Sequence, residues 1–135
     1  CPFAAHIRKS NPRLGTEEEK RHMIRRQSIA YGPELFDDEL EQEKTLEDRG
    51  LVLVCYQSSI VRGFKYIQQS SYNNPNYPLG DNPEPGYDAI NGQTGLETSA
   101  KPVHRFITGM DPNAQTKKTV FPTQFMESSG GEYFF

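Results

Sequence analysis

The sequence has no tryptophan, only two cysteines and no long hydrophobic run. Two cysteines, Cys1 and Cys55, decide little about the redox compartment. No CxxC, no HExxH and no His/Cys cluster at zinc spacing occurs, so the common zinc motifs are excluded. No apolar stretch approaches the length of a membrane-spanning helix, and the chain shows no signal-peptide pattern.

Core-forming residues are also scarce. Hydrophobic residues, tyrosine included, make up 34% of the 135 residues, and ten prolines and eleven glycines favour loops. Such a chain could fold alone, but it is better suited to share its core with a larger body. Because the chain opens within a motif at Cys1 and has no initiator methionine, we expect it to be part of a larger protein.

The charge is unevenly distributed along the chain. A net charge of −3 excludes an overall basic field that attracts nucleic acid. Cations gather in residues 1–26, whereas residues 34–48 are strongly acidic. A local basic cluster in an acidic chain indicates a small anionic ligand or a cofactor carboxylate, and the alternative is solvated surface charge.

Short elements are expected in the first third of the chain. Residues 1–14 should be irregular or form a short helix. The capping-box pattern at Thr16–Glu19 predicts a helix from about Glu17 to Ile24. Residues 28–31 are typical of a short strand stopped by Gly-Pro, and residues 34–48 of a solvated loop or short surface helix.

The strongest strand pattern is the apolar run at residues 51–56, which predicts a central strand covered on both faces. Ser58 or Ser59 can cap a following helix, whose core-facing stripe would be Ile60, Phe64 and Ile67. A strand followed by such a helix favours an α+β layer.

The remaining part of the chain, residues 71–135, is harder to interpret. Residues 71–87 form a long Asn/Pro/Gly/Tyr loop, and residues 94–118 are polar with little periodicity. Two further strands are predicted at residues 119–125 and 132–135.

One of the three histidines stands in an apolar setting. His6 is flanked by Phe3, Ala4, Ala5 and Ile7. It could be a satisfied core histidine, or it could hold a metal or a haem iron through one ring nitrogen. A ligating histidine usually gives its other N–H to a carboxylate or carbonyl.

Two further residues attract attention. Asp88, a single carboxylate among apolar neighbours in a glycine-bounded loop, could accept that N–H from His6; its alternative is an Asx turn or cap. Arg26, just before a strand, could face a bound anion such as peroxide, or it could be a surface arginine.

Five blocks occur in order along the chain and together resemble the C-terminal half of dye-decolourising peroxidases, the fungal type in particular. They are CPFAAHIRKSNPR at 1–13, RHMIRRQSIAYGPE at 21–34, DRGLVLVCYQS at 48–58, GYDAINGQ at 86–93 and GGEYFF at 130–135. The resemblance implies an α+β fold: the ferredoxin-like domain of a dimeric α+β barrel type, here as an incomplete C-terminal haem-binding portion over residues 1–135.

The resemblance also implies a haem b site. His6 would be the proximal iron ligand, Asp88 the acid that accepts its hydrogen bond, and Arg26 the distal arginine, with Arg25 as the competing choice for that role. Leu51 and Leu53 would wall the distal pocket. Arg8 and Arg13 would pair with the haem propionates.

The implied activity is reduction of hydrogen peroxide and one-electron oxidation of bulky dyes and phenols, with Tyr31 as a candidate surface relay. The family's distal GxxDG aspartate does not occur in these 135 residues. The missing N-terminal part of the protein would therefore be a partner, and the isolated polypeptide should have little activity.

The resemblance implies secretion and no nucleic-acid or membrane partner. The competing hypothesis is a non-catalytic α+β binding or interaction module.

Overall fold

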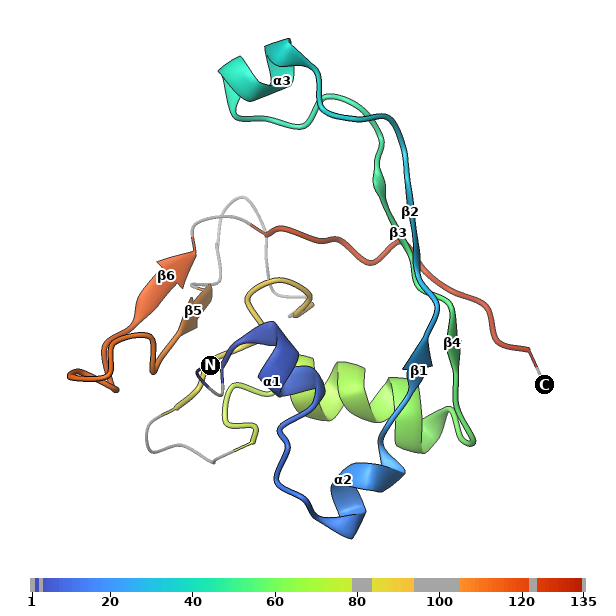
Figure 1. The fold of residues 1–135 in the computed structure, drawn as a ribbon, viewed down its shortest axis with the longest axis vertical. Coiled ribbons are helices and arrows are strands. Elements are labelled where there is room, and N and C mark those ends of the chain that lie inside the picture. The colour runs from blue at the N-terminus through green and yellow to red at the C-terminus, as the bar shows by residue number, and fades with distance from the viewer. Residues whose placement is uncertain (1, 3, 79–83, 94–104, 122–123, 135) are drawn as a thin grey trace. The chain divides into compact units, whose positions relative to one another are not determined.

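A computed structural model describes residues 2, 4–78, 84–93, 105–121 and 124–134. The chain forms two compact units. We call Ile24–Ser58 the ribbon unit, and Cys1–Met23 with Ser59–Phe135 the helical unit. Figure 1 shows the elements of each. No described helix has the length and apolar character needed to cross a membrane.

The ribbon unit is a long antiparallel ladder. Strand β1 (Arg25–Arg26) pairs with β4 (Cys55–Tyr56), and β2 (Ile29–Tyr31) pairs with β3 (Gly50–Val52). The sequence-based prediction of a strand at residues 28–31 is therefore confirmed to within one residue. Between the two paired stretches the ladder is interrupted, although the Gln27 amide still donates to the Val54 carbonyl at 2.7 Å.

The predicted central strand at residues 51–56 is wrong in this structure. The run is divided between β3 and β4, and each of its strands pairs on one edge only. Leu51 and Leu53 are 45% and 39% exposed. The apolar pattern of residues 51–56 correctly predicted β-strands. Burial on both faces, however, requires further elements packed over the sheet, and no described residue of the ribbon unit forms such a layer.

The acidic segment of the ribbon unit folds around one buried carboxylate. Helix α3 (Asp37–Gln42) places Glu39 at 3% exposure. Glu39 accepts hydrogen bonds from both terminal nitrogens of Arg49, at 2.6 and 2.8 Å, and from the Leu46 amide at 2.6 Å. These donors favour the ionised form, so the Arg49 guanidinium first, and then backbone amides, hold the pKa of Glu39 well below its ordinary value.

The helical unit contains α1 (His6–Ser10) and α2 (Glu17–Arg21). Thr16 caps α2 by accepting from the Glu19 amide at 3.1 Å, as the capping-box pattern predicts, but the helix ends at Arg21 rather than Ile24. The short helical segment expected within residues 1–14 is confirmed as α1.

A helix follows the ribbon unit, as predicted, but with the wider π pitch over η1 (Val61–Lys65) and η2 (Ile67–Tyr72). The Ser59 hydroxyl accepts from the Arg62 amide at 3.3 Å, so Ser59 provides the cap. Ile67 is buried, and Ile60 and Phe64 are half-buried, so the predicted stripe faces inward.

The remaining sheet is a pair, β5 (Arg105–Ile107) with β6 (Thr119–Phe121). The sequence did not indicate β5, because three residues beginning with arginine carry no alternating pattern. The strand predicted at 119–125 ends at Phe121; residues 122–123 lie outside the described residues. The strand predicted at 132–135 is wrong over residues 132–134, which form no ladder, and Phe135 is not described.

Removing the buried charge should loosen the acidic loop. We expect Glu39→Gln to accelerate amide hydrogen exchange at Leu46, whose N–H loses its charged acceptor. Because the pKa of Glu39 is depressed, its stabilisation is present above the ordinary carboxyl range and is lost as pH falls below it. Glu41→Gln, at an exposed position of the same helix, is the control; equal protection in both variants would contradict the assignment.

Candidate functional site

The first helix presents three polar side chains to one neighbourhood. His6 lies in the first turn of α1, and Lys9 and Ser10 follow one turn later. The Ser10 hydroxyl donates to the His6 carbonyl at 2.9 Å and contacts the Tyr72 hydroxyl at 3.0 Å. The His6 and Tyr72 rings lie 5.3 Å apart between centroids, so the end of η2 packs beside the histidine.

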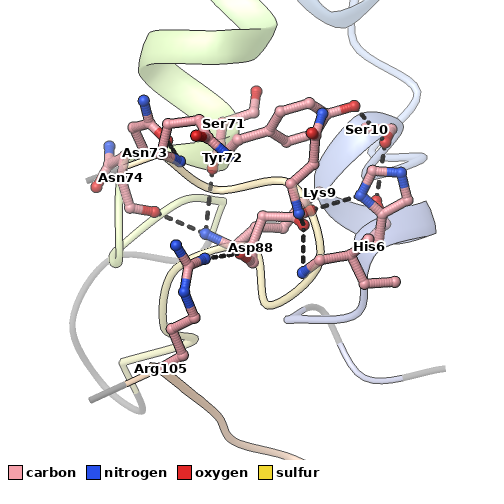
Figure 2. A network of polar contacts seen from close by, with 12 residues as sticks. His6, Lys9, Ser10, Ser71, Tyr72, Asn73, Asn74, Asp88 and Arg105 are labelled. Carbon is pink, nitrogen blue, oxygen red and sulfur yellow. Dashed lines mark hydrogen bonds and ion pairs between the residues drawn. The ribbon is translucent and has the colours of Figure 1, made fainter. Parts of the chain in front are cut away.

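The centre of the site is a histidine–carboxylate pair, shown in Figure 2. His6 Nδ1 lies 2.8 Å from Asp88 Oδ2. The Asp88 side chain is fully buried, whereas the His6 side chain is 26% exposed. An ionised carboxylate can only accept, so Nδ1 carries the hydrogen, and in the neutral imidazole the lone pair is then on Nε2. The described residues form no hydrogen bond to Nε2.

Asp88 is held on three sides. Its second oxygen, Oδ1, accepts from the backbone amides of Ile90 at 3.0 Å and Asn91 at 2.7 Å, while its own amide donates to the Tyr72 carbonyl at 3.0 Å. The two sequence-based interpretations of Asp88 are thus both realised, one on each oxygen. The Asx turn fixes the carboxyl group in the orientation that reaches His6.

Two glycines allow the Asp88 loop to lie against its neighbours. A Cβ on Gly86, whose φ is +98°, would stand 2.1 Å from the Phe106 carbonyl oxygen of β5. A Cβ on Gly92 would stand 2.6 Å from the Asp88 carbonyl oxygen. No other residue type fits either distance without a backbone shift.

The other predicted site residues fall on both units. Arg8 is half-buried in the helical unit and donates to the Pro12 carbonyl at 2.6 Å, and Arg13 is exposed, with its amide bound to the Glu19 carboxylate. The ribbon unit carries four more exposed residues: Arg26 on β1, Tyr31 on β2, Leu51 on β3, and Leu53 between β3 and β4. The structure therefore assembles His6 with Asp88 within one unit.

Sequence reasoning missed two buried cations beside the pair. Lys9 is 0% exposed and Arg105 is 1% exposed. Arg105 Nη1 lies 3.5 Å from the Asp88 carbonyl oxygen. Burial lowers the pKa of Lys9 to about 8, and attraction to Asp88 opposes that shift. A signal for Lys9 was available, because it follows His6 by three positions on a helix, but lysine is ordinarily an exposed residue.

No family model matches the chain. The whole chain is 41% identical to peroxidase 2 of Mycetinis scorodonius and 39% identical to a dye-decolorizing peroxidase of Exidia glandulosa, covering 28% and 25% of these proteins. The chain is homologous to a segment of the fungal dye-decolorizing peroxidases. It spans between a quarter and a third of the length of the relatives it matches.

Solved structures of dye-decolorizing peroxidases are also similar to this chain. An ancestral D-type dye-decolorizing peroxidase aligns with 93% of the chain at a TM-score of 0.82 and 44% identity, over 28% of its own length. The peroxidase from Auricularia auricula-judae aligns with 97% of the chain, at a TM-score of 0.81 and 34% identity, over 30% of its own length. Another relative, whose haem pocket was engineered for asymmetric sulfoxidation, aligns over 93% of the chain and 28% of its own, at a TM-score of 0.78 and 32% identity. These relatives confirm the expected α+β, ferredoxin-like fold, of which this chain is a part.

Filling the space at Gly86 should displace the Asp88 loop. We expect Gly86→Ala to lower the free energy of unfolding by roughly 2–5 kcal/mol, from a positive-φ cost of about 1–2 kcal/mol plus overpacking. Gly15→Ala, also at positive φ but with no atom within 4 Å of the added Cβ, is the control and should show only the smaller cost. Denaturant titration measures both, and equal losses would contradict the close approach.

Proposed function

We propose that residues 1–135 are the haem-binding portion of a dye-decolorizing peroxidase, which reduces hydrogen peroxide and oxidises bulky dyes and phenols in one-electron steps. The observation that carries the proposal is the 2.8 Å contact between His6 Nδ1 and the buried Asp88, with His6 Nε2 left to a ligand. Homology to the fungal peroxidases over the whole chain supports the reaction class. No observation favours the non-catalytic module.

The residues present fit haem b. A neutral imidazole with its other N–H fixed by a carboxylate is a common axial ligand of haem iron, and the contact between His6 and Asp88 would allow His6 this form. Arg8 and Arg13, close in sequence on the same unit, are the cations assigned to the propionates. Haem, when bound, supplies the redox chemistry with peroxide. The protein would orient the iron-binding histidine, tune the basicity of its free ring nitrogen and keep other iron ligands away.

Asp88 would act through His6. A carboxylate that accepts the Nδ1–H increases the electron density at Nε2, which strengthens the bond to ferric iron. The backbone amides of Ile90 and Asn91 hold the acceptor in place, so the ring cannot rotate without losing the 2.8 Å contact. The contact with Asp88 therefore sets the orientation of the His6 ring.

The peroxide side is assigned to Arg26, Leu51 and Leu53. Arg26, always charged, suits stabilisation of the negative charge that develops as the peroxide bond breaks. Leu51 and Leu53 are assigned to the pocket wall. The acid–base carboxylate that moves the proton is assigned to sequence outside these 135 residues, since no GxxDG motif occurs here. We also assign the protein to the extracellular space, in keeping with the fungal relatives.

Dyes too large for the pocket require an exposed donor site. Tyr31, on β2 and 45% exposed, is the proposed relay, because tyrosine can lose an electron and pass its phenolic proton to water. Its alternative role is packing: Tyr31 lies against Gly50 on β3, where a Cβ would stand 2.8 Å from the Tyr31 hydroxyl.

The ligand assignment is tested by optical spectra of the haem-loaded, complete protein. We expect His6→Ala to lose the Soret band of the ligated form, whereas His22→Ala retains it. His22 is a matched control, since it stacks on Tyr66 at 3.4 Å and does not contact Asp88. Asp88→Asn should keep the band but reduce haem affinity or activity roughly 10–100-fold. An unchanged spectrum in His6→Ala would overturn the proposal.

The relay is tested by substrate size. We expect Tyr31→Phe to slow oxidation of bulky dyes and to leave small phenolic donors unaffected, because only the former depend on an exposed radical site. Steady-state kinetics with one donor of each kind measures the difference. Equal loss for both donors would indicate a packing role instead.

A further inference from the structure

Lys9 is an unusual group for the centre of a small unit. Its side chain is fully buried, and Nζ donates to the backbone carbonyls of Ser71 at 3.1 Å and Asn74 at 2.6 Å. A buried ammonium is costly unless it is paired and hydrogen-bonded. Nothing in the packing of α1 alone requires a charge at this position, since methionine would fill a similar volume.

The carbonyls that Lys9 binds flank the anchor of Asp88. Ser71 and Asn74 lie on either side of Tyr72, and the Tyr72 carbonyl accepts the Asp88 amide at 3.0 Å. The backbone at the end of η2 therefore binds both α1, through Lys9, and the Asp88 loop, through the Asp88 amide. Figure 2 shows His6, Lys9 and Asp88 close to this backbone segment.

We propose that Lys9 is a positioning residue, which ties the His6 helix to the segment that anchors Asp88 and so keeps His6 and Asp88 within hydrogen-bond distance. This inference rests on the proposed function, because its effect is exerted on the haem ligand. Without Lys9, α1 should be held less firmly against the end of η2, and the hydrogen bond from His6 to Asp88 should be longer and weaker.

The iron–histidine stretching band in the resonance Raman spectrum of the ferrous, haem-loaded, complete protein tests the proposal. This band reports the strength of the hydrogen bond to the ligand, which a general loss of stability does not shift. We expect Lys9→Met to lower its frequency relative to the unchanged protein. Lys20→Met is the control, since it removes the same charge from an exposed position paired with Glu17, and it should leave the band in place.

The outcomes are distinguishable. A band at the original frequency in Lys9→Met overturns the inference and leaves the proposed function standing. If the unchanged protein shows no iron–histidine band, both fail. If Lys9→Met does not fold, Lys9→Gln, which keeps a donor but no charge, is measured in its place. A lowered frequency in Lys9→Gln supports the proposal, and the original frequency overturns it.

Discussion

The hydrogen bond between His6 Nδ1 and Asp88 Oδ2 is the interaction on which the site depends. It joins residues 82 positions apart in sequence, and most of the polar contacts around it keep its two partners in place. The Asx turn orients Asp88, Ser10 links the turn of α1 to Tyr72, and the end of η2 receives both Lys9 and the Asp88 amide. The glycines at 86 and 92 allow the loop to approach closely enough for these contacts to form.

Part of this site could be predicted from the sequence. The settings of His6 and Asp88 marked both as candidates, but the residues alone left open an ordinary alternative for each, a core histidine and an Asx turn. The structure brings the two side chains into contact. Lys9 and Arg105 were missed for a physical reason. Charged side chains are exposed in most proteins, so their burial follows from tertiary contacts that a one-dimensional pattern does not contain.

The fold was predicted unevenly for a similar reason. Local signals succeeded: Thr16 caps its helix, Ser59 caps the next, and residues 29–31 form a strand. Expectations that depended on partners failed. The run at 51–56 has the composition of a buried strand, yet it pairs on one edge and leaves Leu51 and Leu53 exposed. Those exposed residues fit the low hydrophobic content of the chain and the proposal that further sequence completes the pocket.

The most direct test of the account is a crystal structure of the complete, haem-loaded protein, because it locates the iron and its ligand together. We expect the iron to be bonded to His6 Nε2, with His6 Nδ1 still donating to Asp88. An iron bonded to another residue, such as His22 or His104, or a His6 ring turned away from Asp88, would contradict the central claim.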